Sequence, residues 1–76
     1  MLGVKAVIEN IKSVLRLHSG SKKIYDKQVA FALKVTPNIL ATSKKRDSHL
    51  YTEILNWCHE TGVDADFIFF GTKVEV

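Results

Sequence analysis

The hydrophobic residues at the start of the chain recur at steps of three and four positions. They are Val4, Val7, Ile8, Ile11, Val14 and Leu15. This spacing places them on one face of an α-helix, while charged residues such as Lys5 and Arg16 fall on the opposite face. The stretch Ser19-Gly20-Ser21 favours a turn and ends the pattern. We therefore predict a long amphipathic helix that begins near Val4 and ends at this stretch.

Two shorter helices are predicted next. The second covers about residues 25–33, and its apolar positions are Val29, Ala30 and Leu33. Thr36 is a favourable N-cap for a third helix, and Pro37 suits the first position because no N–H donor is needed there. This third helix extends to about Arg46.

Two further helices are predicted near the C-terminus. Ser48 is the expected N-cap of the fourth helix and Gly62 its end. The apolar residues of this helix are Tyr51, Ile54, Leu55 and Cys58. Asp64 is the expected cap of a fifth helix that Gly71 closes, with Phe67, Ile68 and Phe70 packed onto the fourth. Phe69 is rotated by about 100° from Phe70, so we expect it to be exposed and to join a dimer or interdomain contact.

Five helices with short connections and no convincing strand predict an all-α fold. Residues 1–71 form one domain, because a chain of 76 residues leaves no room for two. Residues 72–76 are predicted to be a tail or the start of a linker.

The composition is that of an ordinary globular protein, with 46% hydrophobic and 25% charged residues. A single cysteine, Cys58, excludes an internal disulfide and suits the reducing cytosol. No apolar run reaches the length of a membrane-spanning helix, and the N-terminus has no signal-peptide pattern. We therefore expect a soluble, intracellular protein that does not bind a membrane.

Charge is distributed unevenly along the chain. Residues 1–46 carry ten Lys and Arg residues against Glu9 and Asp26, a net charge of +8. Residues 47–76 carry only Lys73 against six acidic residues, a net charge of −5. Such asymmetry is typical of proteins that bind a polyanion on one side. On charge alone, a solvated basic surface is the alternative.

The second and third predicted helices are separated only by a short connection around Lys34 and Val35. Two short helices across a tight turn are typical of the helix-turn-helix unit, which presents its second helix to the major groove of DNA. The unit needs a small residue where the helices cross, and Ala30 is available. It also needs apolar residues that hold the helices together, here Val29, Leu33, Val35 and Leu40. The alternative is a structural helical hairpin with a solvated polar face.

The third helix has a polar face suited to reading bases. At about 100° per residue, four side chains fall within an arc of roughly 100° opposite Leu40: Asn38, Ala41, Thr42 and Lys45. Asparagine pairs with adenine, and the methyl groups of threonine and alanine contact thymine. Lys45 is predicted to reach a guanine or a phosphate, while Lys44 and Arg46 are predicted to hold phosphates.

Two further stretches of the chain read DKQVAFALKVTPNILATSKKRD and LYTEILNWCHETGVDADFIFFG. They resemble the N-terminal DNA-binding domain of CI-type temperate phage repressors, and the resemblance covers about Val4 to Gly71. It implies a five-helix, lambda-repressor-like helix-turn-helix fold. It also implies a bacteriophage repressor of transcription, involved in lysogeny, that binds double-stranded operator DNA as a homodimer in the cytoplasm of a bacterial host. In this family a C-terminal domain usually supplies most of the dimerisation, and we expect such a domain to be absent here.

The resemblance also assigns residues to DNA contact. From the third helix these are Thr36, Pro37, Asn38, Ala41, Thr42 and Lys45. Lys27 and Gln28, at the start of the second helix, are implied to approach the DNA backbone or its outer bases.

Three residues depart from the family pattern. Lys34 stands where the turn usually has glycine, so we expect a strained left-handed backbone there. Ser43 replaces a large apolar residue, and we expect it to loosen the packing of the third helix. Asp26 heads the second helix, where it suits the helix dipole but is expected to repel a nearby phosphate.

Other functions have less support in the sequence. A protein-interaction module, similar to an antirepressor or an antitoxin, is the alternative on the same helical fold. No acid–base pair or Cys–His nucleophile indicates an enzyme. We predict no cofactor and no metal site, because Cys58 and His59 are adjacent in a helix and lack the spacing of zinc ligands. Five cations either extend the phosphate-binding surface or decorate solvated helices: Lys5, Lys12, Arg16, Lys22 and Lys23.

Overall fold

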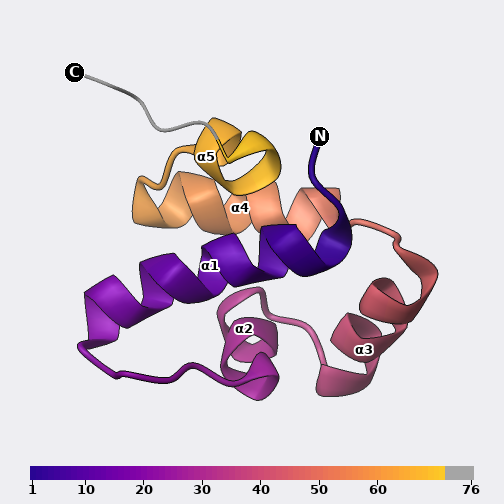
Figure 1. Cartoon of the computed structure of the whole chain (residues 1–76), viewed down its shortest axis with the longest axis horizontal. Coiled ribbons are helices and arrows are strands. Elements are labelled where there is room, and N and C mark those ends of the chain that lie inside the picture. The colour runs from indigo at the N-terminus through magenta and orange to yellow at the C-terminus, as the bar shows by residue number, and fades with distance from the viewer. Residues whose placement is uncertain (72–76) are drawn as a thin grey trace.

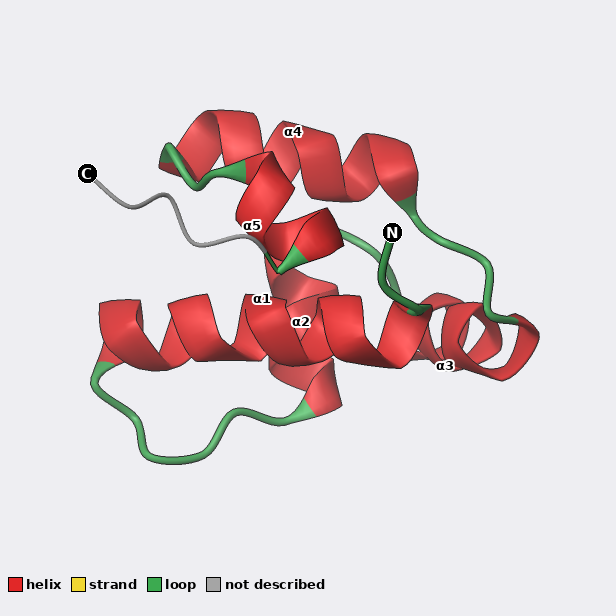
Figure 2. Cartoon of the chain, turned by 45° about the horizontal axis from the view of Figure 1, so that its top comes forward, coloured by secondary structure: helices red, strands yellow, loops and turns green. Residues whose placement is uncertain are grey.

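The structure is a computed structural model that describes residues 1–71. The long first helix lies at its centre. Helix α1 (Val4–Ser19) lies between two pairs of helices (Figure 1). Helices α4 (Tyr51–Thr61) and α5 (Ala65–Phe70) lie on one side of it, and α2 (Asp26–Ala32) and α3 (Pro37–Arg46) on the other. Residues 1–71 contain only helices and loops, so the all-α prediction is confirmed for them (Figure 2). The predicted tail or linker, residues 72–76, lies outside the described residues.

The apolar stripe predicted for α1 forms much of the core. Its buried residues are Val4, Val7, Ile8, Ile11 and Val14. Through this stripe α1 contacts α2, α3 and α5. The N-terminus of α1 is tied to the end of α3, because the Asp47 carboxylate accepts the N–H of Val4 at 3.0 Å.

Helices α2 and α3 are joined by residues 33–36 and pack against each other and α1. Of the five residues predicted at these contacts, Val29, Ala30, Leu33 and Leu40 are buried, and Val35 is partly buried against the core. Lys34 in the turn has a φ of 61°. A left-handed residue other than glycine costs roughly 1–2 kcal/mol, so the expected strain is present at this position.

Ser43 is buried, and the expectation of loose packing around it is wrong. Its hydroxyl donates a hydrogen bond to the carbonyl of Ser48, and the N–H of Ser48 donates to the carbonyl of Ser43 at 3.0 Å. The void beside Ser43 and Leu40 measures about 10 Å³, which is the limit for a single water molecule. A polar side chain is suited to this position because it closes the loop that follows α3.

The prediction that Ser48 caps the fourth helix is wrong, because the helix begins later in the chain. Helix α4 begins at Tyr51, and Leu50 occupies the N-cap without a side-chain hydrogen bond. The predicted apolar set was only partly correct, because Tyr51 and Leu55 are 47% and 49% exposed. The buried residues are Ile54, Trp57 and Cys58, a narrow stripe at three- and four-residue spacing.

Phe69 is buried, which contradicts its predicted exposure. It is 6% exposed, whereas Phe70 is 54% exposed. Helix α5 is fastened to α1, since the Asn10 amide donates to the carbonyls of Phe67 and Ile68 at 3.2 and 3.1 Å. This attachment turns Phe69 inward, where its ring lies 5.7 Å from that of Tyr51.

Candidate nucleic-acid interface

Helix α3 is attached to the molecule along one narrow side. Its only buried residues are Leu40 and Ser43. The helix begins as predicted, with Pro37 in the first turn and the Thr36 hydroxyl accepting the N–H of Ile39 at 3.2 Å. Helix α3 therefore lies at one edge of the fold with most of its surface free (Figure 1).

The side chains predicted to face outward from α3 do so. Asn38, Ala41, Thr42 and Lys45 are all exposed, opposite a Leu40 that is 1% exposed. Thr36 and Pro37, at the start of the helix, are exposed as well. The orientation followed from helical geometry, because one buried position determines where its neighbours point.

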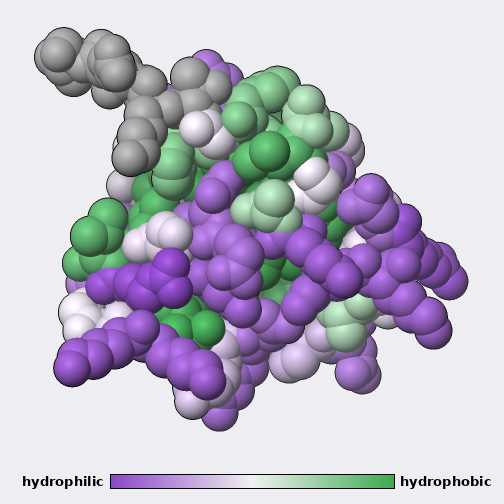
Figure 3. Space-filling model, viewed as in Figure 1, coloured by the Kyte–Doolittle hydropathy of each residue, from purple (hydrophilic) through white to green (hydrophobic). Residues whose placement is uncertain are grey.

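A hollow runs along each flank of α3. One, of about 310 Å³, is lined by Asn38, Thr42 and Arg46 together with residues of the loop before α4. The other, of about 570 Å³, is lined by Ala41, Lys44, Lys45, Lys5 and Asp26. Helix α3 is thus a ridge between two hollows. The side of the molecule that carries α3 is mostly hydrophilic, while hydrophobic surface gathers near α5 (Figure 3).

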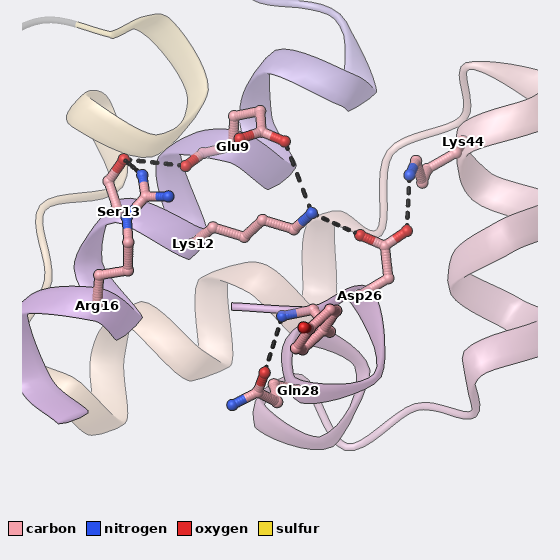
Figure 4. Close-up of polar contacts among 8 residues, drawn as sticks. Glu9, Lys12, Ser13, Arg16, Asp26, Gln28 and Lys44 are labelled. Carbon is pink, nitrogen blue, oxygen red and sulfur yellow. Dashed lines mark hydrogen bonds and ion pairs between the residues drawn. The ribbon is translucent and has the colours of Figure 1, made fainter. Parts of the chain in front are cut away.

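Asp26 joins three helices through two lysines (Figure 4). Lys44 Nζ donates a hydrogen bond to Asp26 Oδ2 at 2.7 Å, and Lys12 Nζ lies 2.7 Å from Oδ1. Because Oδ1 is shielded from solvent and accepts no well-directed hydrogen bond, its contact with Lys12 is an ion pair. The ammonium group of Lys12, followed by that of Lys44, lowers the pKa of Asp26, and Asp26 in turn raises the pKa of Lys12. These two cations offset the repulsion that Asp26 was expected to exert on a phosphate.

Lys5 belongs to this basic surface, although helical periodicity alone did not assign it. Lys44, Lys45 and Arg46 lie in the last turn of α3, where cations complement the helix dipole. Lys5 lies in the first turn of α1, where a cation opposes the dipole. The helix dipole therefore favours the three cations of α3 but gives no reason for a lysine at position 5, which lines the same hollow as Lys44 and Lys45. The sequence offered Lys5 as one of five cations that either extend the phosphate-binding surface or decorate solvated helices, and only the packing of α1 beside α3 placed it in this hollow.

The two predicted contact residues of α2 lie apart from both hollows. Lys27 is exposed, and Gln28 is partly buried. The Gln28 side-chain carbonyl accepts the N–H of Tyr25 at 2.8 Å, which leaves its amide group as the available donor (Figure 4). Five cations were left undecided between phosphate binding and solvation: Lys5, Lys12, Arg16, Lys22 and Lys23. Lys12 pairs with Asp26, and among the five only Lys5 lines one of the two hollows beside α3.

No protein-family model matches this chain, and no match was found among curated proteins or solved structures. In residues 1–71, no group of three or more His, Cys, Asp or Glu side chains is placed to hold a metal ion. None of the helices in this part of the chain has the length and apolar character needed to cross a membrane. Cys58 is buried in the core, as predicted, and burial raises the pKa of its thiol. The candidate interface therefore rests on geometry and charge.

Proposed function

We propose that this chain is a sequence-specific DNA-binding domain that places α3 in the major groove. The observation that carries the proposal is the projecting ridge of α3, a helix in which only Leu40 and Ser43 are buried. An α-helix with its side chains is about 10–12 Å across, and the major groove of B-DNA is about 12 Å wide. A helix enters this groove only if it is free on the sides that face the DNA, and α3 meets that requirement.

The side chains on the ridge supply the chemistry for reading bases. Asn38 presents an amide that pairs with the N6 and N7 atoms of adenine, and Thr42 and Ala41 present methyl groups for thymine. All three are exposed. Their neutral character suits the centre of the groove, where hydrogen bonds and methyl contacts distinguish base pairs.

The hollows on the flanks suit the sugar-phosphate walls of the groove. Lys5, Lys44 and Lys45 line one hollow, and Arg46 lines the other. Cations in these places bind phosphates of any sequence and orient the helix. Lys27 and Gln28, at the start of α2, are proposed to contact the DNA backbone or outer bases beside this region.

Within this proposal, the fold is a lambda-repressor-like helix-turn-helix domain and the protein is a phage-type transcriptional repressor. Support comes from the resemblance of residues 26–47 and 50–71 to CI-type repressors and from the packing of α2 on α3 across a short turn. The domain is proposed to bind operator DNA as a homodimer in the bacterial cytoplasm. Each copy would read one half-site, so the operator is expected to have two half-sites related by two-fold symmetry.

Selection of bound duplexes from a random library tests this function directly. The selected duplex and a random duplex are then titrated in gel-shift assays with the wild type and with Asn38→Ala. We expect Asn38→Ala to lose about 1–3 kcal/mol of binding free energy on the selected duplex and little on the random duplex. Failure to enrich any sequence, or equal losses on both duplexes, would overturn the base-reading role of α3.

A second pair of variants tests the phosphate contacts. Lys5→Ala is expected to weaken binding to both duplexes and to reduce the slope of log affinity against log salt by about 1. Arg16→Ala is the matched control, since it removes one cation from the same helix about 16 Å further along. Equal effects of the two variants would show that Lys5 contributes only net charge.

A further inference from the structure

Phe31 of α2 is the most exposed large hydrophobic side chain in residues 1–71, at 86%. It lies outside the ridge of α3 and its two hollows. An aromatic ring exposed to this degree contributes little to folding, since its surface stays in contact with water. Its exposure indicates an interaction surface if a binding groove and a suitable partner chemistry accompany it.

A groove lies directly beside Phe31, between the end of α1 and helix α2. It has a volume of about 240 Å³, and the apolar residues that line it are Leu15, Ile24, Phe31 and Ala32. A cavity of about 150 Å³ is large enough to bind benzene. The groove therefore has room for one aromatic or leucine side chain, with the Phe31 ring as one wall.

The charge around this groove is positive. Lys22 and Lys23 directly precede Ile24, and Lys27 lies on the same face of α2 as Phe31, one helical turn earlier. All three lysines are exposed. No acidic residue occurs between Asn10 and Tyr25, and the Asp26 carboxylate is held by Lys12 and Lys44. An acidic ligand is thus favoured at the rim.

A second copy of the chain is a poor occupant for the same reason. Two-fold pairing through this groove would place the lysines of one copy against those of the other. Like charges across an interface oppose association. A partner with carboxylates beside an apolar anchor matches both the groove and its rim.

We propose that this groove binds an acidic amphipathic helix of a partner protein. One large apolar side chain of that helix inserts beside Phe31, and its carboxylates face Lys22, Lys23 and Lys27. Helix binding in an apolar groove is a common mode of peptide recognition. The groove shares no lining residue with the hollows beside α3. Gln28, which lines it, and Lys27, at its rim, are also proposed DNA contacts, so the tests of this interaction are made without DNA.

The test uses a synthetic amphipathic peptide of about 16 residues, long enough to form a helix, with Leu and Phe on one face and Glu on the other. It is titrated into the ¹⁵N-labelled full chain. We expect chemical-shift changes centred on Ile24, Phe31 and Ala32, and Phe31→Ser is expected to weaken binding by about tenfold or more. Leu17→Ser is the matched control, because Leu17 is 83% exposed but does not line the groove. Its effect on affinity is expected to be negligible.

Charge reversal tests the rim. The triple change Lys22→Glu, Lys23→Glu and Lys27→Glu is expected to lower the affinity for the acidic peptide by about tenfold or more. It is expected to raise the affinity for a peptide in which Lys replaces Glu. The proposal is overturned if the wild type binds both peptides equally, if it shows no binding at about 1 mM peptide, or if the shifts cluster elsewhere. A concentration-dependent dimer in sedimentation that Phe31→Ser abolishes would also overturn it, since the occupant would then be a second copy.

Discussion

Replacing Asp26 by asparagine removes the charge that connects α1, α2 and α3 while keeping the shape of the side chain. Lys12 and Lys44 each lose a contact of 2.7 Å. After this change Glu9, at 3.6 Å, is the only carboxylate within residues 1–71 that still pairs with Lys12. Since the Lys12 side chain is 15% exposed, its ammonium is left with little solvent to replace the lost carboxylate.

The expected cost follows from the exposure of these groups. Exposed ion pairs contribute about 0–1 kcal/mol, and breaking a buried pair costs about 3–5 kcal/mol. The Asp26 and Lys44 side chains are 44% and 29% exposed, so this network lies between the two cases. We expect Asp26→Asn to lower the free energy of unfolding by about 1–2 kcal/mol. Part of this loss, about 0.3–1 kcal/mol, belongs to the helix dipole, because Asp26 lies in the first turn of α2.

Urea denaturation at several pH values provides the assay. Folding lowers the pKa of Asp26, so its stabilisation is complete above the ordinary value of 3.8 and is lost as the pH falls through the folded-state pKa. The stability difference between wild type and Asp26→Asn should therefore be constant near neutral pH and shrink below about pH 3.8. It should shrink again at high pH, because the pKa of Lys12 is raised above 10.5 and its charge is lost beyond that raised value.

A double-mutant cycle with Lys12→Met separates the ion pair from the helix dipole. Asp66→Asn is the control for the dipole, since Asp66 lies in the first turn of α5 and takes part in no ion pair within the described residues. A coupling energy within about 0.3 kcal/mol of zero, together with parallel pH profiles, would refute the stabilising role of this network.

The same variant is expected to bind DNA more tightly if α3 enters the major groove as proposed. Asp26→Asn frees Lys44 and removes a negative charge from the hollow that Lys5 and Lys45 also line. A unit charge about 4 Å from another contributes about 1 kcal/mol in water, so affinity for any duplex should rise about fivefold. Unchanged or weaker binding would contradict the placement of a phosphate beside Lys44.

Three further predictions concern single positions. In urea denaturation, Lys34→Gly should have an unfolding free energy about 1 kcal/mol higher than Lys34→Ala, because glycine relieves the left-handed backbone. Lys45 is the control: it lies within α3, where glycine is a poorer helix former than alanine, so Lys45→Gly should be less stable than Lys45→Ala. The same order at both sites would rule out strain at Lys34. Ser43→Ala should lower the unfolding free energy by about 1–2 kcal/mol, since the carbonyl of Ser48 loses its donor. If the variant were as stable as the wild type, this hydrogen bond would not contribute to stability. The Cys58 thiol should react with a thiol reagent much more slowly in the native protein than in urea, because it is 5% exposed and its pKa is raised; equal rates would contradict its burial.

Local pattern was sufficient to predict the five helices and the outward face of α3. Apolar spacing located α1, and three predicted end signals are present as expected: the Thr36 cap, the Asp64 cap and the Gly62 terminus. Burial of Leu40 is enough to predict the outward face of α3, because helix geometry relates each side chain to its neighbours without reference to the rest of the protein.

Tertiary packing decided the features that local pattern predicted wrongly or left open. Phe69 is buried because α5 is fastened to α1, a contact between residues more than fifty positions apart. Ser43 packs well because a loop carbonyl meets its hydroxyl, and Lys5 lines a hollow beside α3 because α1 passes next to that helix. The periodicity of one helix specifies which face is buried but not which partner covers it. The sequence alone therefore determined the helices and their apolar faces, and only the assembled fold determined which charges and aromatic rings came together.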